Sequence, residues 1–115
     1  MDRGNYYKLR TRDWFRAKGY AVELVERLRR VQTKDKDGRP RVIFVKQDCF
    51  GADGIAMNEH GIVFWNAVLG KANVARAVKG LAAHPYPACV QRWVVAWELR
   101  AREPTIIEAA LDEPS

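Results

Sequence analysis

The stretch between Gln47 and Gly70 constrains the fold of this chain more than any other. A short apolar run, Ile55 to Met57, and a longer one, Ile62 to Leu69, flank the polar segment Asn58-Glu59-His60-Gly61. Two apolar runs joined by a short turn with glycine are typical of a β-hairpin. The longer run alternates little, which is expected of an inner strand buried on both faces.

Two carboxylates, Asp48 and Asp53, stand at the mouth of this hairpin. A carboxylate there is costly to bury unless it is paired or bound to a cation, so the pattern indicates a metal site. The alternative is that both aspartates form turns beside Gly51 and Gly54, since aspartate and glycine are common turn residues. The spacing of the residues leaves both interpretations open.

The segment Gly51-Ala-Asp-Gly-Ile-Ala56 resembles the Asp motif of the PD-(D/E)XK nuclease superfamily, near the archaeal-type Holliday-junction resolvases and related phage and plasmid proteins. The resemblance runs from about Gly4 to about Leu99. It implies a helix and a strand, then a hairpin with Asp on its first strand and Glu-x-Lys on its second, and then a helix. The implied fold class is α/β, a restriction-endonuclease-like mixed β-sheet flanked by helices, with Asp53 as a metal-binding residue.

The chain departs from this family pattern at three positions that normally carry charge. Asn66 stands at the acidic position of Glu-x-Lys, and Val68 stands at its lysine. Lys8 occupies the approximate place of an acidic residue that the first helix often carries in the resolvases. Lys71 and Lys46 are the lysines that could replace the missing one.

Two functions follow from the resemblance. The first is a DNA endonuclease of the structure-selective, Holliday-junction-resolvase-like kind, dependent on Mg²⁺ or Mn²⁺, in which the metal activates a water. Asp53, Asn66 and Lys71 would be its catalytic residues, and Asp48 and Asp53 its metal ligands. The second is a catalytically degenerate relative that binds duplex or branched DNA without cutting it. A small RNA- or DNA-binding module of unrelated α/β fold is a third interpretation.

The charge of the chain is concentrated in its first part. Residues 1–46 hold 14 basic and six acidic side chains, a balance of +8, whereas residues 47–115 hold six basic and eight acidic ones, a balance of −2. This asymmetry favours an anionic partner such as DNA, although a generally basic, solvated surface is the alternative. The candidate nucleic-acid-binding residues are Lys8, Arg12, Arg16, Lys34, Lys36, Arg39, Arg76 and Lys79.

The rest of the chain predicts an alternation of helices and strands. The first helix places Tyr6, Leu9, Trp14 and Ala17 on one half of its wheel and Lys8, Arg12 and Arg16 in an outward stripe. The strand at 20–31 and the strand at 41–46 can form a long hairpin whose charged tip reaches into a groove or is disordered. Helices are predicted at 5–18 and 71–83, strands at 20–31, 41–46, 92–99 and 105–109, and a frayed tail at 110–115.

The length of 115 residues predicts a single domain. Cys49 and Cys89 lie in no Cys-x-x-Cys pair, which argues against a zinc site, and we expect both to be buried in a reducing cytoplasm. The N-terminus lacks a signal peptide and no apolar run is long enough to cross a membrane, so no membrane partner is expected. The sequence also allows a homodimer.

Overall fold

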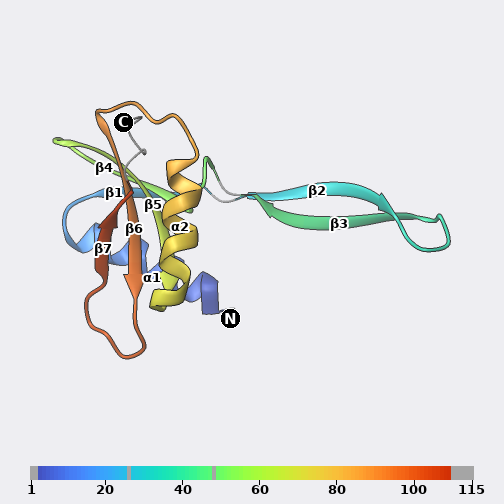
Figure 1. Cartoon of the computed structure of the whole chain (residues 1–115), viewed down its shortest axis with the longest axis horizontal. Coiled ribbons are helices and arrows are strands. Elements are labelled where there is room, and N and C mark those ends of the chain that lie inside the picture. The colour runs from blue at the N-terminus through green and yellow to red at the C-terminus, as the bar shows by residue number, and fades with distance from the viewer. Residues whose placement is uncertain (1–2, 26, 48, 110–115) are drawn as a thin grey trace.

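The computed structural model describes residues 3–25, 27–47 and 49–109 (Figure 1). Asp48 and the predicted frayed tail lie outside these residues. The described chain is of the expected α/β class. Its elements are α1 (Arg3–Ala17), β1 (Ala21–Leu24), β2 (Arg27–Lys34), β3 (Pro40–Gln47), β4 (Gly54–Asn58), β5 (Gly61–Leu69), a short 3₁₀ helix η1 (Lys71–Asn73), α2 (Val74–Ala82), β6 (Val90–Trp97) and β7 (Thr105–Glu108).

Five of the strands form one mixed sheet in the order β1-β4-β5-β6-β7. Neighbouring strands are antiparallel except β5 and β6, which are parallel and are connected through α2. The predicted central hairpin is thus confirmed as β4 and β5, and the predicted edge strand as β7. Asn58 closes the hairpin turn, since its side-chain oxygen accepts hydrogen bonds from the amides of His60 and Gly61.

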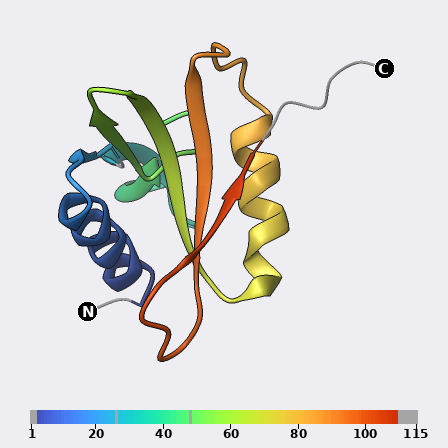
Figure 2. The ribbon, with the colours of Figure 1, turned by 90° about the vertical axis from the view of Figure 1, so that its left-hand side faces the viewer.

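The two long helices cover opposite faces of this sheet (Figure 2). Successive residues of β5 therefore point into two separate cores. Trp65 is buried with Phe15 and Trp97 on the α1 side, while Val68 packs against the cluster of Leu81 and Val94 on the α2 side. This two-sided burial explains why β5 is nearly continuous in apolar residues.

The buried face of α1 differs from the face that its apolar residues predict. Tyr7, Thr11 and Phe15 are buried at four-residue spacing, whereas Tyr6 is 48% exposed and Ala17 is exposed. Thr11 can be buried because its hydroxyl donates to the carbonyl of Tyr7 at 2.7 Å and accepts from the indole N–H of Trp97 at 2.8 Å. The apolar face expected from Tyr6 and Ala17 is therefore wrong.

The single strand predicted at 20–31 is two strands in different sheets. β1 pairs with β4 in the main sheet, and β2 pairs only with β3. Figure 1 shows the β2–β3 ribbon, here called the arm, extending away from the rest of the molecule. The amide of Val25 donates to the carbonyl of Asp53 at 2.9 Å, so the chain leaves and re-enters the main sheet at neighbouring points.

The tip of the arm forms a defined turn around Asp35. One oxygen of the Asp35 carboxylate accepts hydrogen bonds from the amides of Asp37 and Arg39, each at 2.9 Å. Gly38 adopts a φ of 76°, which glycine tolerates without strain. Because Asp35 is engaged with the backbone, it shapes the turn that presents the neighbouring cations.

The cysteines differ in exposure. Both are free thiols, Cys49 being half-buried and Cys89 exposed, so the expectation that both are buried is wrong for Cys89. Among the described residues, no helix combines the length and the apolar character needed to cross a membrane.

Candidate functional site

Asp53 lies where β4 and β5 begin to diverge. Gly54 and Trp65 are the last paired residues of the hairpin at this end, and the Asp53 amide donates to the Trp65 carbonyl at 2.8 Å. Two residues further along β5, the amide of Ala67 donates instead to the Asp53 carboxylate at 3.0 Å. The side chain thus takes the place of a backbone acceptor, and the residue is 6% exposed.

The cation beside this carboxylate is Lys8, from α1. Its ammonium lies 3.7 Å from the other Asp53 carboxylate oxygen, and the two side chains are 14% and 8% exposed. Lys8 therefore does not belong to an outward stripe, because the buried carboxylate requires a positive neighbour. Of the other cations predicted on that stripe, Arg12 pairs with Asp13 at 3.1 Å and Arg16 is exposed.

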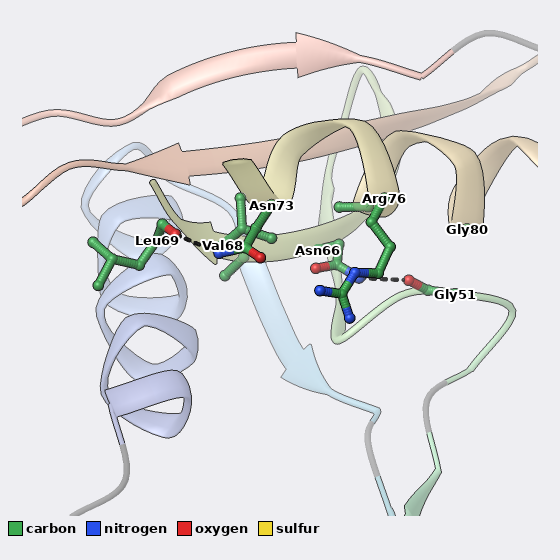
Figure 3. A pocket seen from close by; sticks show the side chains of 9 residues that line it. Gly51, Asn66, Val68, Leu69, Asn73, Arg76 and Gly80 are labelled. Carbon is green, nitrogen blue, oxygen red and sulfur yellow. Dashed lines mark hydrogen bonds between the residues drawn. The ribbon is translucent and has the colours of Figure 1, made fainter. Parts of the chain in front are cut away.

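Asn66 is engaged with the loop that precedes β4. Its amide group donates to the carbonyl of Gly51 at 2.8 Å, and its side chain lines a cleft of about 530 Å³ between β5 and α2 (Figure 3). Arg76 also lines this cleft, whereas Lys71 does not. Val68, at the family's lysine position, lines the same cleft and offers no polar group.

The described residues do not match the ligand set of a Mg²⁺ site. Mg²⁺ prefers several oxygen ligands, usually with one or two carboxylates. The described chain contains no group of three His, Cys, Asp or Glu side chains that could hold a metal, and the carboxylate of Asp53 already has an ammonium beside it. Asp48, the second predicted ligand, lies outside the described residues.

The arm carries a second group of predicted residues, Lys34, Lys36 and Arg39, at its tip. All three are exposed, as are Arg30 and Arg41 nearby. Asp35 and Asp37 are the acidic residues of this tip, and Asp35 is held in the turn. The arm thus presents a surplus of positive charge far from the helices.

One face of the arm combines cations with exposed apolar side chains. Residues paired directly across a ribbon lie on the same face, and successive pairs alternate. Arg30 pairs with Phe44, and Lys34 pairs with Pro40, so these pairs share a face with Val42. Phe44 is 66% exposed and Val42 is 42% exposed. We call this face, formed by Arg30, Gln32, Lys34, Pro40, Val42 and Phe44, the Phe44 face.

The remaining predicted cations lie on the main body. Arg76 and Lys79 are exposed on α2, and Arg16 is exposed on α1. Since the two helices cover opposite faces of the sheet, these cations do not form one continuous surface (Figure 2). The structure therefore gathers only the arm residues into a common basic surface.

The sequence interpretation missed an aromatic cavity beside the segment between β3 and β4, where the chain returns from the arm to the main sheet. Phe50, Phe64, His84 and Tyr86 line it with Pro85, Pro87 and Val90, and its volume is about 400 Å³. These residues come from three segments that are distant in the sequence, so no local pattern groups them. The signals that could have drawn attention to it were Phe50, directly before the Asp motif, and the Pro85-Tyr86-Pro87 segment.

Comparisons of the chain with protein-family models, with curated proteins and with solved structures find no match. The resemblance to the PD-(D/E)XK nucleases therefore rests on the Asp motif and on the order of the elements.

Proposed function

We propose that this protein binds duplex DNA through its arm, without requiring a metal. The observation that carries the proposal is the Phe44 face, where exposed cations lie beside an exposed aromatic ring on a ribbon that none of the other described elements covers. Lysine and arginine neutralise phosphates and release counterions. An exposed phenylalanine in such a surface gains from contact with bases or sugars.

The shape of the arm favours DNA over double-stranded RNA. The major groove of B-DNA is about 12 Å wide and admits a two-stranded β-ribbon. The major groove of A-form RNA is deep and narrow, and side chains cannot read it. Lys36 and Arg39, at the tip, would contact phosphates along the groove, while Phe44 would face its floor or wall.

The main body supports a nuclease-type fold of the restriction-endonuclease-like kind as part of this proposal. Its elements α1, β1, the β4–β5 hairpin and α2 follow the order helix, strand, hairpin and helix that the resemblance implies. The resemblance also puts an acidic residue near the start of the first helix, and Lys8, in that approximate place, contacts Asp53. The ammonium would thus occupy the neighbourhood where an active relative binds its cation.

The endonuclease that the resemblance implies is the competing function. Cutting would need a second carboxylate beside Asp53, for which Asp48 is the candidate, and a cation in place of the family's lysine. The contact between Lys8 and Asp53 favours binding without cutting, because it already balances the charge of the one carboxylate that the structure describes there.

Binding is tested by fluorescence anisotropy of a labelled 24-base-pair duplex in EDTA over a series of salt concentrations. The variant Arg30→Gln/Lys34→Gln/Arg39→Gln should lose about tenfold or more in affinity, and its log–log salt slope should fall by about 2–3 units. The matched control Lys18→Gln/Arg100→Gln/Arg102→Gln removes the same charge from the main body and should change both quantities much less. Equal losses in the two variants would refute the role of the arm.

Cutting is tested on the same duplex and on flap and four-way-junction DNA, with Mg²⁺ and with Mn²⁺. The proposal expects binding in EDTA and intact DNA in either metal. Cleavage that Asp53→Asn abolishes would establish the endonuclease instead.

The proposal also includes a homodimer, which many groove-binding proteins form. It includes a cytoplasmic location as well, which suits the two free cysteines.

A further inference from the structure

The aromatic cavity lies where the chain returns from the arm to the main sheet. β3 ends at Gln47, and Phe50 forms one wall of the cavity. Phe64, from β5, and Tyr86, from the segment after α2, form others. Its volume of about 400 Å³ falls within the ~300–1,000 Å³ of typical small-ligand sites.

Phe50 occupies a backbone position that a phenylalanine rarely adopts. Cys49 and Ala52 exchange both backbone hydrogen bonds, at 2.9 and 3.1 Å, so Phe50 and Gly51 are the two central residues of a tight turn. Their φ angles are 53° and 81°. Two-residue turns with positive φ at both positions strongly prefer Asn-Gly, because a side chain at the first position is strained.

Burial does not explain the phenylalanine either, since Phe50 is 60% exposed. A side chain that is strained in the backbone and exposed to water contributes little to the stability of the free protein. Strain of this kind is concentrated at functional sites, so the turn points to a ligand that contacts the ring.

The rings around the cavity are fixed in place but are not stacked on one another. The Tyr86 hydroxyl donates to the Phe50 carbonyl at 2.7 Å and so ties the turn to the segment after α2. Phe50 and His84 meet at 69° with centroids 5.6 Å apart, and Phe64 and Tyr86 meet at 61° with centroids 4.8 Å apart. Arg92, 8% exposed, brings a positive charge within 5.3 Å of the Tyr86 ring.

We propose that this cavity takes one unpaired nucleobase of the DNA held by the arm, and this inference rests on the proposed function. Bases stack on aromatic side chains whatever their identity, which suits a cavity of rings without a matching set of polar groups. A base within an intact duplex is already stacked and cannot enter, whereas a bulged base can leave the helix at little cost.

The inference predicts opposite effects of one substitution on stability and on binding. Phe50→Asn supplies the residue that the turn prefers, so its melting temperature should rise by a few degrees. The same variant removes one ring of the cavity. It should lose the preference for a duplex carrying a single bulged 2-aminopurine over the perfect duplex, which we expect to be about tenfold or more in the wild type.

Phe50→Tyr, which keeps the ring, should retain the preference. The affinity of Phe50→Asn for the perfect duplex should equal that of the wild type, because the arm is unchanged. The fluorescence of 2-aminopurine, measured on binding, should report a stacked base for the wild type and for Phe50→Tyr only.

The outcomes separate this inference from the proposed function. Wild-type protein that binds both duplexes equally would overturn the base site and leave DNA binding by the arm intact. Protein that binds neither duplex would overturn both proposals. If Phe50→Asn keeps the preference for the bulge and instead converts a dimer to a monomer in sedimentation velocity, a second copy of the chain covers the cavity and the base site is wrong.

Discussion

The ammonium of Lys8 lies 3.7 Å from a carboxylate oxygen of Asp53, and both side chains are largely withdrawn from water. The second oxygen of that carboxylate accepts a hydrogen bond from the amide of Ala67, so Asp53 connects α1 to the end of the central hairpin. If Asp53 were only a metal ligand, its neutralisation in EDTA would leave stability unchanged or improve it. The contact with Lys8 gives the opposite expectation.

We expect Lys8→Met and Asp53→Asn each to lower the free energy of unfolding by about 3 kcal/mol, because each removes one member of a direct ionic contact in a largely buried site. The double variant should lose about 1–3 kcal/mol less than the sum of the two. Urea denaturation in EDTA measures these values. Arg12→Met, which removes a cation from the more exposed pair with Asp13, is the control and should cost less than about 1 kcal/mol. Additive losses at Lys8 and Asp53 would contradict a direct interaction.

Reversing the charge of Lys8 should make the melting temperature of the protein depend on divalent cations. In Lys8→Glu two carboxylates would lie close together, and their repulsion should lower stability until a cation binds between them. We expect the melting temperature of this variant to rise by several degrees with millimolar Mn²⁺ or Mg²⁺. Lys8→Gln is the control and should not respond. A comparable rise in the wild type would show that Asp53 already shares a metal site with a further ligand.

Excision of the arm should leave the main body folded. Among the residues whose burial the structure describes, the two buried clusters include none from β2 or β3, and Val25 and Asp53 are joined by a backbone hydrogen bond. Replacing residues 26–48 with a short Gly-Ser linker should therefore shift the melting temperature by only a few degrees while removing DNA binding. Circular dichroism and anisotropy measure the two effects. Retention of DNA binding by the shortened protein would place the binding surface on the main body.

Gly51 should not tolerate a side chain. A Cβ atom there would lie 2.6 Å from the Gly80 carbonyl oxygen, and the φ of 81° is itself unfavourable for alanine. We expect Gly51→Ala to cost about 2 kcal/mol or more in thermal or urea unfolding. Gly61→Ala is a suitable comparison, because a Cβ atom at Gly61 meets nothing within 4 Å. Equal stability of the two variants would mean that the turn and α2 are not in close contact.

The parts of the fold that were predictable are those encoded locally. The central hairpin follows from two apolar runs and a turn closed by Asn58, and the edge strand β7 follows from a short β-branched run. The division between β1 and β2 was not predictable, because the apolar pattern of residues 20–31 continues across it. Only the pairing of Leu24 with Gly54, far along the chain, shows where the main sheet ends.

The candidate site was predictable only in part, for the same reason. Asp53 was identified from its motif, but the neighbour that balances its charge comes from α1, and a cation on a helix is ordinarily expected to face water. Thr11 is a similar case, since its burial depends on a hydrogen bond from Trp97. The ring of Phe50 packs against His84 and Tyr86, which follow it in the chain after β4, β5 and α2.

The position of the arm in the chain has a consequence for the order of folding. Pairing β1 with β4 requires closure of the whole intervening segment, and the entropy lost on closure grows with the logarithm of its length. The ladder between β2 and β3 is local and can form first, in microseconds, as hairpins do. Once it has formed, its two ends lie side by side, and the remaining search for the β1–β4 register covers only a few residues. A substitution that weakens the ladder should therefore slow the folding of the main sheet while leaving its unfolding rate unchanged.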